Sequence, residues 1–365
     1  MVDNAIVRHV RAWQRKYLTD AGYKLARFKA GTRAGFFTRT GAFGLALYSA
    51  GNPVYSREKQ AVFHGTRKFF LDGVGGEQRF MLRRQLHMLE KGLCMSPRRE
   101  TFATDYIDST VDAFAALLNK SNEDGSSVLS EIEIAWGFDV LDDYFVATAG
   151  SSHSRIVNAR DRYRQMPARG RSEVGESRPY AVGSVQSRVE IDDLVHLSRV
   201  RTSVRRYSAK PVEQWVLDQA VGVALESPTA CNRVPWTVRI FREAESARSV
   251  AKIAMGTAGY LENISGLAVF VGDLSAYAHE RDRHLIYIDS SLAAMSFILA
   301  LQSQNVSSCC VNWPDIPERE KRMAAALGLQ PHERVIMLVL FGYADGDGLT
   351  PYSAKTDVAR VRRFE

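Results

Sequence analysis

The sequence has few cysteines and lacks the features that mark secreted or membrane-spanning proteins. Its four cysteines match neither the spacing of a zinc site nor that of a disulfide framework, so a reducing, cytoplasmic setting is predicted. No run of about eighteen uncharged apolar residues is found, so no transmembrane helix is predicted. The first residues also lack the apolar core and small-residue cleavage site of a signal peptide.

Several catalytic and binding motifs are absent as well. No Gly-x-Gly-x-x-Gly sequence follows a predicted strand, which argues against a Rossmann-type NAD site. No group of side chains has metal-ligand spacing, and no Ser-His-Asp arrangement is evident, so neither a metal centre nor a triad hydrolase is predicted. Internal repeats are also missing from the sequence.

The positive charge of the chain is concentrated at one end. Lys and Arg outnumber Asp and Glu by 48 to 41, and residues 1–50 alone carry nine Lys or Arg against two Asp or Glu. Residues 4–30 combine helical spacing of apolar positions with surrounding Arg and Lys. Two interpretations stay open: a solvated helical face, or contact of residues 1–50 with a membrane surface or a protein partner. Nucleic-acid binding is not expected.

The length of 365 residues suits two domains. A helical, basic domain is expected over residues 1–150, a Ser-, Gly- and Arg-rich linker over 151–190, and a second domain over 191–365. Helices are predicted over residues 4–30, 78–91, 104–120, 130–148, 155–165, 192–198, 211–226 and 289–302. Strands are predicted over residues 236–241, 267–271, 306–313 and 334–343. This mixture indicates an α+β fold.

One string in the first half contains a histidine and a glutamate at helical spacing. His87 and Glu90 lie three residues apart in LHMLEKGL, residues 86–93, and Gly92 is a plausible helix stop. This pair could orient a proton donor or form a structural hydrogen bond, and both interpretations stay open.

Two polar loops flank the predicted helix of residues 211–226. The first has the sequence RTSVRRY at 201–207, and the second has SPTACNRVPW at 227–236. Folding could bring both loops against one flat anionic ligand, since guanidinium groups suit a phosphate and amides suit a heterocycle edge. The alternative is an exposed basic stretch followed by an ordinary Pro-rich turn.

The two loops, followed by the run at 307–313, resemble the nitroreductase family of FMN-dependent oxidoreductases over residues 196–365. The positions that carry the resemblance are Arg201, Ser203, Arg205, Tyr207, Pro211, Val212, Ser227, Pro228, Thr229, Asn232, Pro235 and Trp236. The resemblance implies a central, mainly antiparallel sheet flanked by helices. It also implies a homodimer with FMN at the interface. The string around His87 more weakly resembles nitroreductase-like proteins associated with surface-polysaccharide synthesis.

The resemblance also implies roles for residues of the two loops. In the first loop, Arg201 would bind the FMN phosphate, Ser203 would hydrogen-bond near it, and Arg205 would lie by the pyrimidine edge of the ring. In the second loop, the cofactor-binding residues would be Pro228, Thr229 and Asn232. The first two would lie against the ring, and the Asn232 amide, able to donate and accept, would contact the ring or the ribityl chain.

The implied site has two further parts. Cys310, Val311 and Asn312 would present backbone N–H groups to the ring, and Lys355 in the C-terminal segment would complete the phosphate site. Cys310 is interpreted as a small buried packing residue, with a redox thiol as the alternative.

Three residues depart from the family pattern. Val234 stands where the family commonly has Gln, and Asn312 and Trp313 depart from a run that is often Pro, acidic and Gly. A Trp in place of Gly would be expected to narrow the pocket.

The function implied by the resemblance is oxidoreduction by ping-pong turnover. NAD(P)H would reduce FMN and leave, and an unidentified small-molecule acceptor would then take the electrons. No catalytic side chain is assigned, because FMN carries the chemistry. A step in a biosynthetic pathway is one option for the reaction. The alternative is a flavin-fold binding or accessory protein with little turnover, which uses its basic N-terminal domain to contact a partner or membrane surface.

Overall fold

The computed structural model describes residues 53–71, 76–118, 120–121, 127–166, 178–181, 183 and 186–365. The predictions for residues 4–30, and for residues 167–177 of the predicted linker, lie outside these residues. By their contacts, Gln60–Glu365 form one compact unit, separate from Met1–Lys59. The domain boundaries at 150 and 190 stay a prediction.

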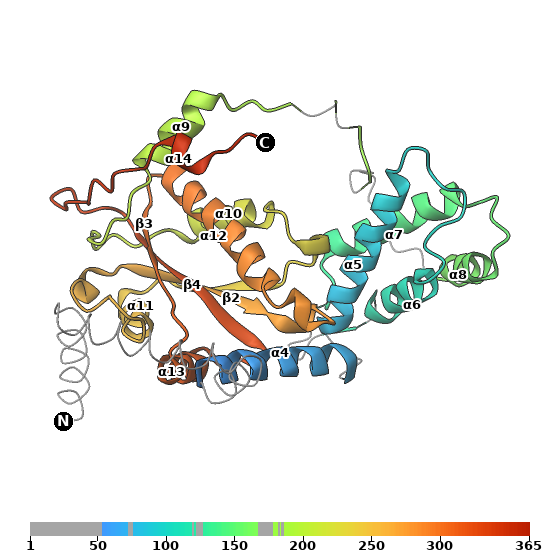
Figure 1. Ribbon diagram of the computed structural model, residues 1–365, viewed down its shortest axis with the longest axis horizontal. Helices are drawn as coiled ribbons and strands as arrows, with labels where there is room; N and C mark the ends of the chain where they lie inside the picture. Colours follow the sequence, from blue (N-terminus) through green and yellow to red (C-terminus); the bar gives the residue numbers. More distant parts are fainter. Residues whose placement is uncertain are drawn as a thin grey trace. The chain divides into compact units, whose positions relative to one another are not determined.

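The first half of the described chain is helical (Figure 1). Its helices are α4 (Pro53–Leu71), α5 (Gly76–Leu93), α6 (Ile107–Leu118), α7 (Glu131–Ala147) and α8 (Ser154–Arg164). Apolar side chains of α5 to α8 share one core, in which Leu86, Phe114 and Tyr144 are fully buried. α7 begins with a capping box, because Ser130 and Glu133 satisfy each other's backbone N–H groups.

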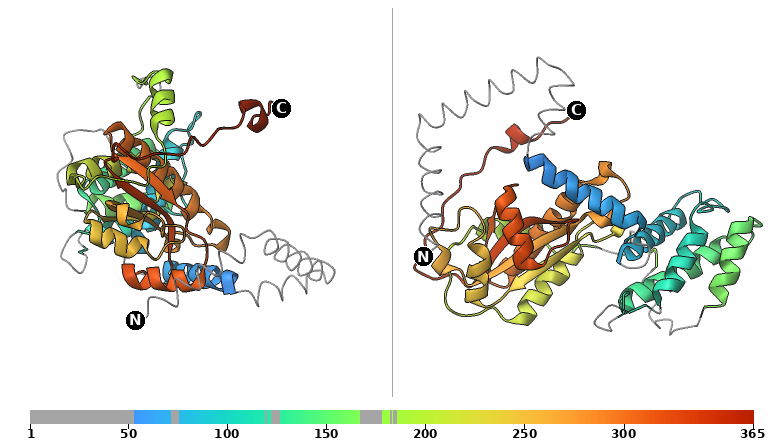
Figure 2. Two further views of the ribbon diagram at one scale, coloured as in Figure 1. Left: turned by 90° about the vertical axis from the view of Figure 1, so that its left-hand side faces the viewer. Right: turned by 90° about the horizontal axis from the view of Figure 1, so that it is seen from below.

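Helix α8 confirms the helix predicted over residues 155–165, inside the stretch of 151–190, and extends the helical region to Arg164. Its Ile156 and Ala159 are buried in the same core as α6 and α7. The teal to green helices α6, α7 and α8 lie together in Figure 2. Arg162 of α8 also pairs with Asp108 at 2.6 Å and with a second carboxylate of α6 at 3.0 Å.

The second half is built around one antiparallel sheet of four strands in the order β1-β2-β4-β3. The strands are β1 (Trp236–Phe241), β2 (Gly266–Asp273), β3 (Ser307–Val311) and β4 (Glu333–Gly342). All four predicted strands are therefore present, and β4 is the longest of those described. The predicted α+β fold, with an antiparallel sheet flanked by helices and preceded by a mostly helical region, is confirmed.

Helices cover both faces of the sheet. The larger helices and short turns of this half are α9 (Ile191–Val200), α10 (Gln214–Leu225), α11 (Ala244–Ala251), α12 (Leu285–Ser303), α13 (Pro317–Leu327), α14 (Val358–Val361), η2 (Ala230–Asn232), η3 (Leu261–Asn263), η4 (Leu274–Ala276) and η5 (Glu280–Asp282). Helices α10 and α12 pack with Phe270 and Phe341 on one face. Helices α11 and α13 pack with Val269 and Leu338 on the other.

Several helices begin or occur where the sequence did not indicate them. α10 begins at Gln214 instead of Pro211, because Glu213 is its extended N-cap residue. Helices α4, α11, α13 and α14 were not predicted. The ends of α13 nevertheless carry standard signals, with Pro317 in its first turn and Gly328 in the left-handed conformation at its end.

A small apolar cluster connects the helical region to the sheet region. Ala61 and Val62 of α4 and Phe80 of α5 pack with Tyr277 and Ile286. Gly65 of α4 comes so close to Leu274 that an added Cβ would lie 2.7 Å from the Leu274 Cβ. The two halves therefore share buried surface inside the compact unit.

Among the described helices, the segment Glu280–Ser303 is long and apolar enough to cross a membrane by length and composition. Half of its most apolar window is buried inside the protein. Its Phe297 and Leu301 lie in the core over the sheet. The segment is therefore apolar because it packs in the core over the sheet.

Candidate functional site

The first predicted loop lies along the outer edge of the sheet. Helix α9 ends at Arg201, and the chain then runs extended beside the edge strand β3. Ser203 forms a parallel bridge with Ser308, and the Val204 N–H donates to the Ser308 carbonyl oxygen at 3.0 Å. Tyr207 forms a second bridge, to Ala344. The structure therefore brings the first loop and β3 together, as the predicted site requires.

The two arginines Arg201 and Arg205 of this loop differ in their contacts. The Arg205 guanidinium donates to the Ser203 carbonyl oxygen at 3.1 Å and lies 5.9 Å from the centre of the Tyr260 ring. The half-buried Arg201 side chain makes no hydrogen bond or ion pair with any residue that the structure describes. Burial raises the pKa of the Cys309 thiol beside them, against the opposing effect of Arg205. Arg201 is thus available for an anionic ligand.

The strand β3 corrects two expectations. Cys310 was predicted to be a buried packing residue, but it is exposed, and Cys309 is buried instead. Successive side chains on a strand point to opposite faces, and here the face of Cys309 meets the core. Trp313 was expected to narrow the pocket, but it is buried in the core and donates to Glu320. Val311 is buried and Asn312 is exposed.

The second predicted loop has an unusual backbone. Cys231, Asn232 and Val234 have φ angles of 56°, 51° and 52°, in the left-handed region. A β-branched residue such as Val234 rarely adopts this conformation, so the surrounding contacts must hold it. One such contact is local, since the Thr229 hydroxyl oxygen accepts from the Val234 N–H at 3.1 Å.

A buried carboxylate of α12 holds the start of this loop. Asp289 accepts from the Ala230 N–H at 2.9 Å and from the Tyr277 hydroxyl at 3.3 Å. Burial raises the pKa of Asp289, although the Ala230 N–H, the Tyr277 hydroxyl and Arg233 each act to lower it. The Arg233 guanidinium lies 5.0 Å from the centre of the Tyr277 ring. Sequence reasoning missed Asp289, which it had placed only as the start of an apolar helix.

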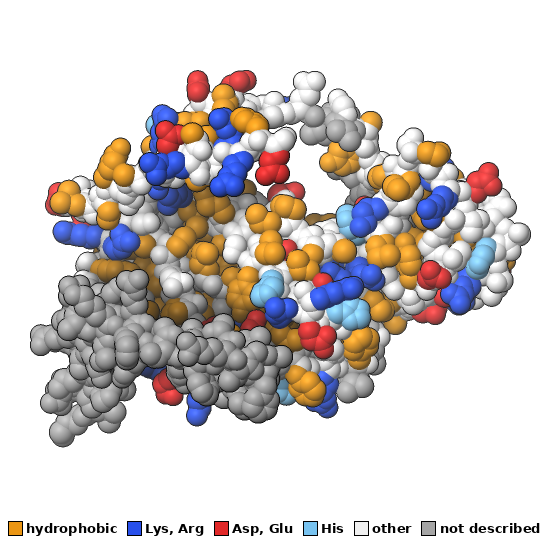
Figure 3. All heavy atoms as spheres, in the orientation of Figure 1, with side chains coloured by type: hydrophobic (Ala, Val, Ile, Leu, Met, Phe, Trp, Pro, Cys, Tyr) orange, Lys and Arg blue, Asp and Glu red, His pale blue; other side chains and the backbone are white. Residues whose placement is uncertain are grey.

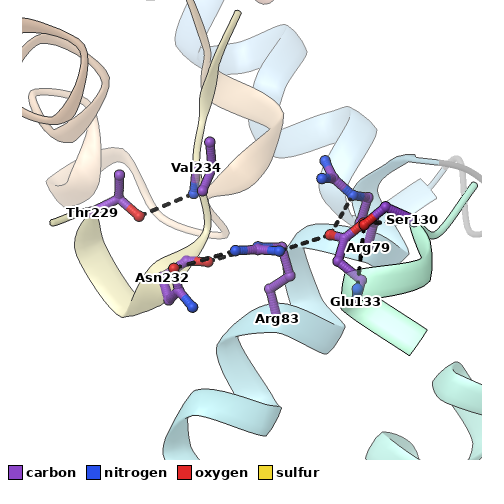
Figure 4. Close-up of polar contacts among 7 residues, drawn as sticks. All are labelled: Arg79, Arg83, Ser130, Glu133, Thr229, Asn232 and Val234. Atoms are coloured by element: carbon purple, nitrogen blue, oxygen red, sulfur yellow. Dashed lines mark hydrogen bonds and ion pairs between the residues drawn. The ribbon is translucent and has the colours of Figure 1, made fainter. Parts of the chain in front are cut away.

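Arg83 of α5 holds the other end of the loop (Figure 4). Its Nε donates to the Asn232 carbonyl oxygen at 2.7 Å, and its Nη2 donates to Asn232 Oδ1 at 3.2 Å. The Asn232 side chain was expected to donate and accept towards the cofactor, but its acceptor oxygen already binds Arg83. No signal in the sequence linked Arg83 to a loop 149 residues away.

The His87–Glu90 pair forms the expected contact on α5. His87 Nδ1 and Glu90 Oε2 lie 3.3 Å apart, and Glu90 Oε1 accepts from Trp136 Nε1 at 2.9 Å. Glu90 therefore ties α5 to α7, which supports the interpretation as a structural hydrogen bond.

One copy of the chain does not bring the whole predicted site together. The 201–207 and 227–236 loops lie at opposite ends of α10, whose 12 residues correspond to a length of about 18 Å. Pro228 is exposed and Thr229 half-buried at the far end. Lys355 lies in a C-terminal segment whose residues 351–365 are all exposed, and no described contact joins it to Arg201.

Comparison with known proteins finds a match in the second half of the chain. Residues 199–263 and 261–343 match the Nitroreductase family model. An NADH dehydrogenase of Thermus thermophilus is 26% identical over 179 residues, which cover 40% of this chain and 85% of that protein. The family resemblance of the C-terminal region is therefore confirmed.

Solved structures of nitroreductases align with slightly less than half of the chain. An FMN-dependent nitroreductase from Clostridium difficile aligns with a TM-score of 0.40 and 19% identity, covering 47% of this chain and 99% of that one. A nitroreductase family protein from Streptococcus pneumoniae aligns with a TM-score of 0.41 and 19% identity, covering 47% of this chain and 100% of that one.

Proposed function

We propose that this protein is an FMN-dependent oxidoreductase that takes a hydride from NAD(P)H and passes the electrons to a small-molecule acceptor. The family match over residues 199–343 supports the class of enzyme. The name of the Thermus thermophilus relative supports NADH as a reductant. We place the reaction in the cytoplasm, and a biosynthetic step is our preferred setting for the acceptor.

The arrangement of the first loop carries this proposal. Arg201, Ser203 and Arg205 lie beside β3, and the Arg201 guanidinium has no ion pair with any described residue. This donor set fits the phosphate and pyrimidine edge of FMN, since both present acceptor oxygens to hydrogen-bond donors. When bound, FMN would accept and release the hydride, so no side chain of the protein needs to act as a nucleophile.

The chain's own residues would bind and orient the cofactor. Arg201 would hold the phosphate, and the fixed cation of Arg205 would favour negative charge at the pyrimidine edge. The backbone of Cys310, Val311 and Asn312 would follow the ring, while Lys355 would reach the phosphate from the C-terminal segment. Thr229, Pro228 and Asn232 would contact the ring from the second loop.

We further propose a homodimer, because the two loops of one copy lie at opposite ends of α10. A second copy would bring its 227–236 loop to the 201–207 loop of the first. Exposed apolar side chains on the outer faces of α10 and α12 supply a surface for this contact: Trp215, Val223, Leu225, Ile288, Leu292 and Met295. Figure 3 shows hydrophobic side chains over α10 and α12.

The dimer can be tested by placing a charge on this surface. Leu292→Glu should give a monomer in sedimentation equilibrium and lose FMN, because a buried carboxylate without a partner opposes association. Ile132→Glu is the control, since Ile132 is a similarly exposed apolar residue on α7. A Leu292→Glu protein that stays dimeric and retains FMN would remove this face from the interface.

The cofactor can be tested by reconstitution. Purified protein incubated with FMN and passed through a desalting column should elute yellow, with close to one FMN per chain. Protein that elutes colourless at saturating FMN would contradict the proposal.

A second function is favoured by the departures from the family pattern. Val234 has a left-handed backbone, and Asn312 is exposed at the end of β3. A flavin-fold accessory protein with little turnover would tolerate such changes, and residues 1–50 would then contact a protein partner or a membrane surface. A protein that binds FMN but does not oxidise NADH or NADPH would favour this function.

A further inference from the structure

We propose that Arg83 is a positioning residue of the flavin site, which turns Asn232 so that its amide N–H₂ group faces the cofactor. This inference rests on the proposed function, because it gives a purpose to Asn232 only if FMN binds the second loop. It makes the helical first half of the chain part of the site.

The geometry of Arg83 fixes the orientation of the Asn232 amide. A guanidinium group has only N–H donors, so the atom that faces it must be an oxygen. Arg83 binds both Asn232 oxygens, at 2.7 Å to the carbonyl and at 3.2 Å to Oδ1. The Asn232 Nδ2 atom makes no hydrogen bond with a described residue, and Figure 4 shows it on the side away from Arg83.

Arg83 is itself held from α7. Its Nη1 donates to Glu133 Oε1 at 2.7 Å, and its guanidinium lies 5.3 Å from the centre of the Trp136 ring. Glu133 is 6% exposed, and it also binds Arg79 at 2.8 Å and the Ser130 N–H at 3.0 Å. Four groups therefore fix the guanidinium before any ligand arrives: two oxygens of Asn232, one carboxylate and one ring.

This arrangement selects which flavin atoms Asn232 can contact. An amide held by its oxygen offers N–H donors, which suit the carbonyl oxygens of the isoalloxazine ring or a ribityl hydroxyl. It does not suit the ring N3–H, which is itself a donor. Arg83 contacts the second loop only at Asn232 among the described hydrogen bonds, so its effect on the cofactor passes through Asn232 and the left-handed loop.

Replacing the guanidinium tests this role. Arg83→Met keeps the length and the apolar packing of the side chain but removes every donor, so FMN should bind about tenfold more weakly in the reconstituted full-length protein. Arg79→Met is the matched control, because Arg79 binds the same carboxylate but does not touch Asn232. Its FMN dissociation constant should stay within about twofold of that of the wild type.

A double-mutant cycle separates positioning from a merely structural effect. In an Asn232→Ala background, Arg83→Met should weaken FMN binding clearly less than in the wild-type background, since no side-chain amide is left to orient and only the bond to the carbonyl oxygen of residue 232 remains to be lost. The visible absorption band of bound FMN should shift with Arg83→Met and stay unchanged with Arg79→Met. If Arg83→Met fails to fold, as judged by thermal melting, Arg83→Lys retains one donor and should bind FMN with intermediate affinity.

The outcomes distinguish this inference from the proposed function. A wild type that binds no FMN overturns both. A wild type that binds FMN, with Arg83→Met equal to it in affinity and spectrum, overturns the role of Arg83 alone. If Arg83→Met weakens FMN binding equally in the wild-type and Asn232→Ala backgrounds, the role of Arg83 in orienting Asn232 is also overturned.

Discussion

The two loops at the ends of α10 are held in place by different means. The 201–207 loop runs extended along β3 and is fixed by backbone bridges of Ser203 and Tyr207 to the sheet region. The 227–236 loop has three left-handed residues and is fixed by side chains from distant elements, Arg83 of α5 and Asp289 of α12. The conformation of the first loop therefore depends on backbone pairing with the sheet region, and that of the second loop depends on side chains of α5 and α12.

This difference indicates which substitutions should change the conformation of each loop. Backbone bridges tolerate most side-chain changes, so a substitution of Arg201, which has no hydrogen bond or ion pair with a described residue, should act on the ligand alone. A left-handed backbone needs outside contacts, so substitutions far from the second loop should change its conformation.

The largest effect is expected at Arg201. Arg201→Ala should weaken FMN binding roughly 100-fold, because hydrogen bonds to a charged group contribute about 1.5–3 kcal/mol. Thermal stability should hardly change, since the Arg201 side chain makes no hydrogen bond or ion pair with a described residue. Arg206→Ala is the control, because Arg206 is exposed and pairs with Asp345 at 2.8 Å. Equal FMN affinities of Arg201→Ala and wild type would take Arg201 out of the site.

The next effect is expected at Asp289. Asp289→Ala should lower the free energy of unfolding by about 2 kcal/mol, because the Ala230 N–H and the buried Tyr277 hydroxyl lose their acceptor. Asp289→Asn keeps an acceptor oxygen and should lose much less. Urea denaturation measures both variants. A loss in Asp289→Ala no larger than that in Asp289→Asn would show that this carboxylate does not hold the second loop.

The same aspartate gives a pH dependence. Because burial raises the pKa of Asp289 above its ordinary value of 3.8, the folded state binds the proton more tightly. Its contribution to stability is complete below pH 3.8 and is lost as pH rises through the raised pKa. As pH rises through the raised pKa, the free energy of unfolding of Asp289→Asn should therefore increase relative to that of the wild type. A difference that is constant with pH in urea denaturation would contradict this assignment.

The smallest effect is expected at the cap of α7. Ser130→Ala should lower the free energy of unfolding by about 1 kcal/mol, the usual loss for an N-cap. FMN affinity should stay the same, because Arg79 and Arg83 still hold Glu133. Isothermal titration with FMN, alongside thermal melting, checks both statements. A large loss of FMN affinity would mean that the cap itself positions Arg83.

The sequence allowed the sheet and the first loop to be predicted, because their signals are local. Short alternating or apolar runs indicated the four described strands. The Arg201-Ser203-Arg205 spacing indicated the first loop as a candidate phosphate site, which stays a prediction. The supports of the second loop could not be predicted. Arg83 and Asp289 lie 149 and 59 residues from their partners, and only tertiary packing brings them together. Exposure of Cys310 was missed because strand register decides which cysteine faces the core.

The most direct test of the central claim is an anaerobic titration of the FMN-reconstituted protein with NADH and NADPH. The account predicts that at least one of them bleaches the visible flavin absorption, and that adding an electron acceptor restores it. Protein that binds FMN but is not bleached by either nucleotide would contradict the oxidoreductase function.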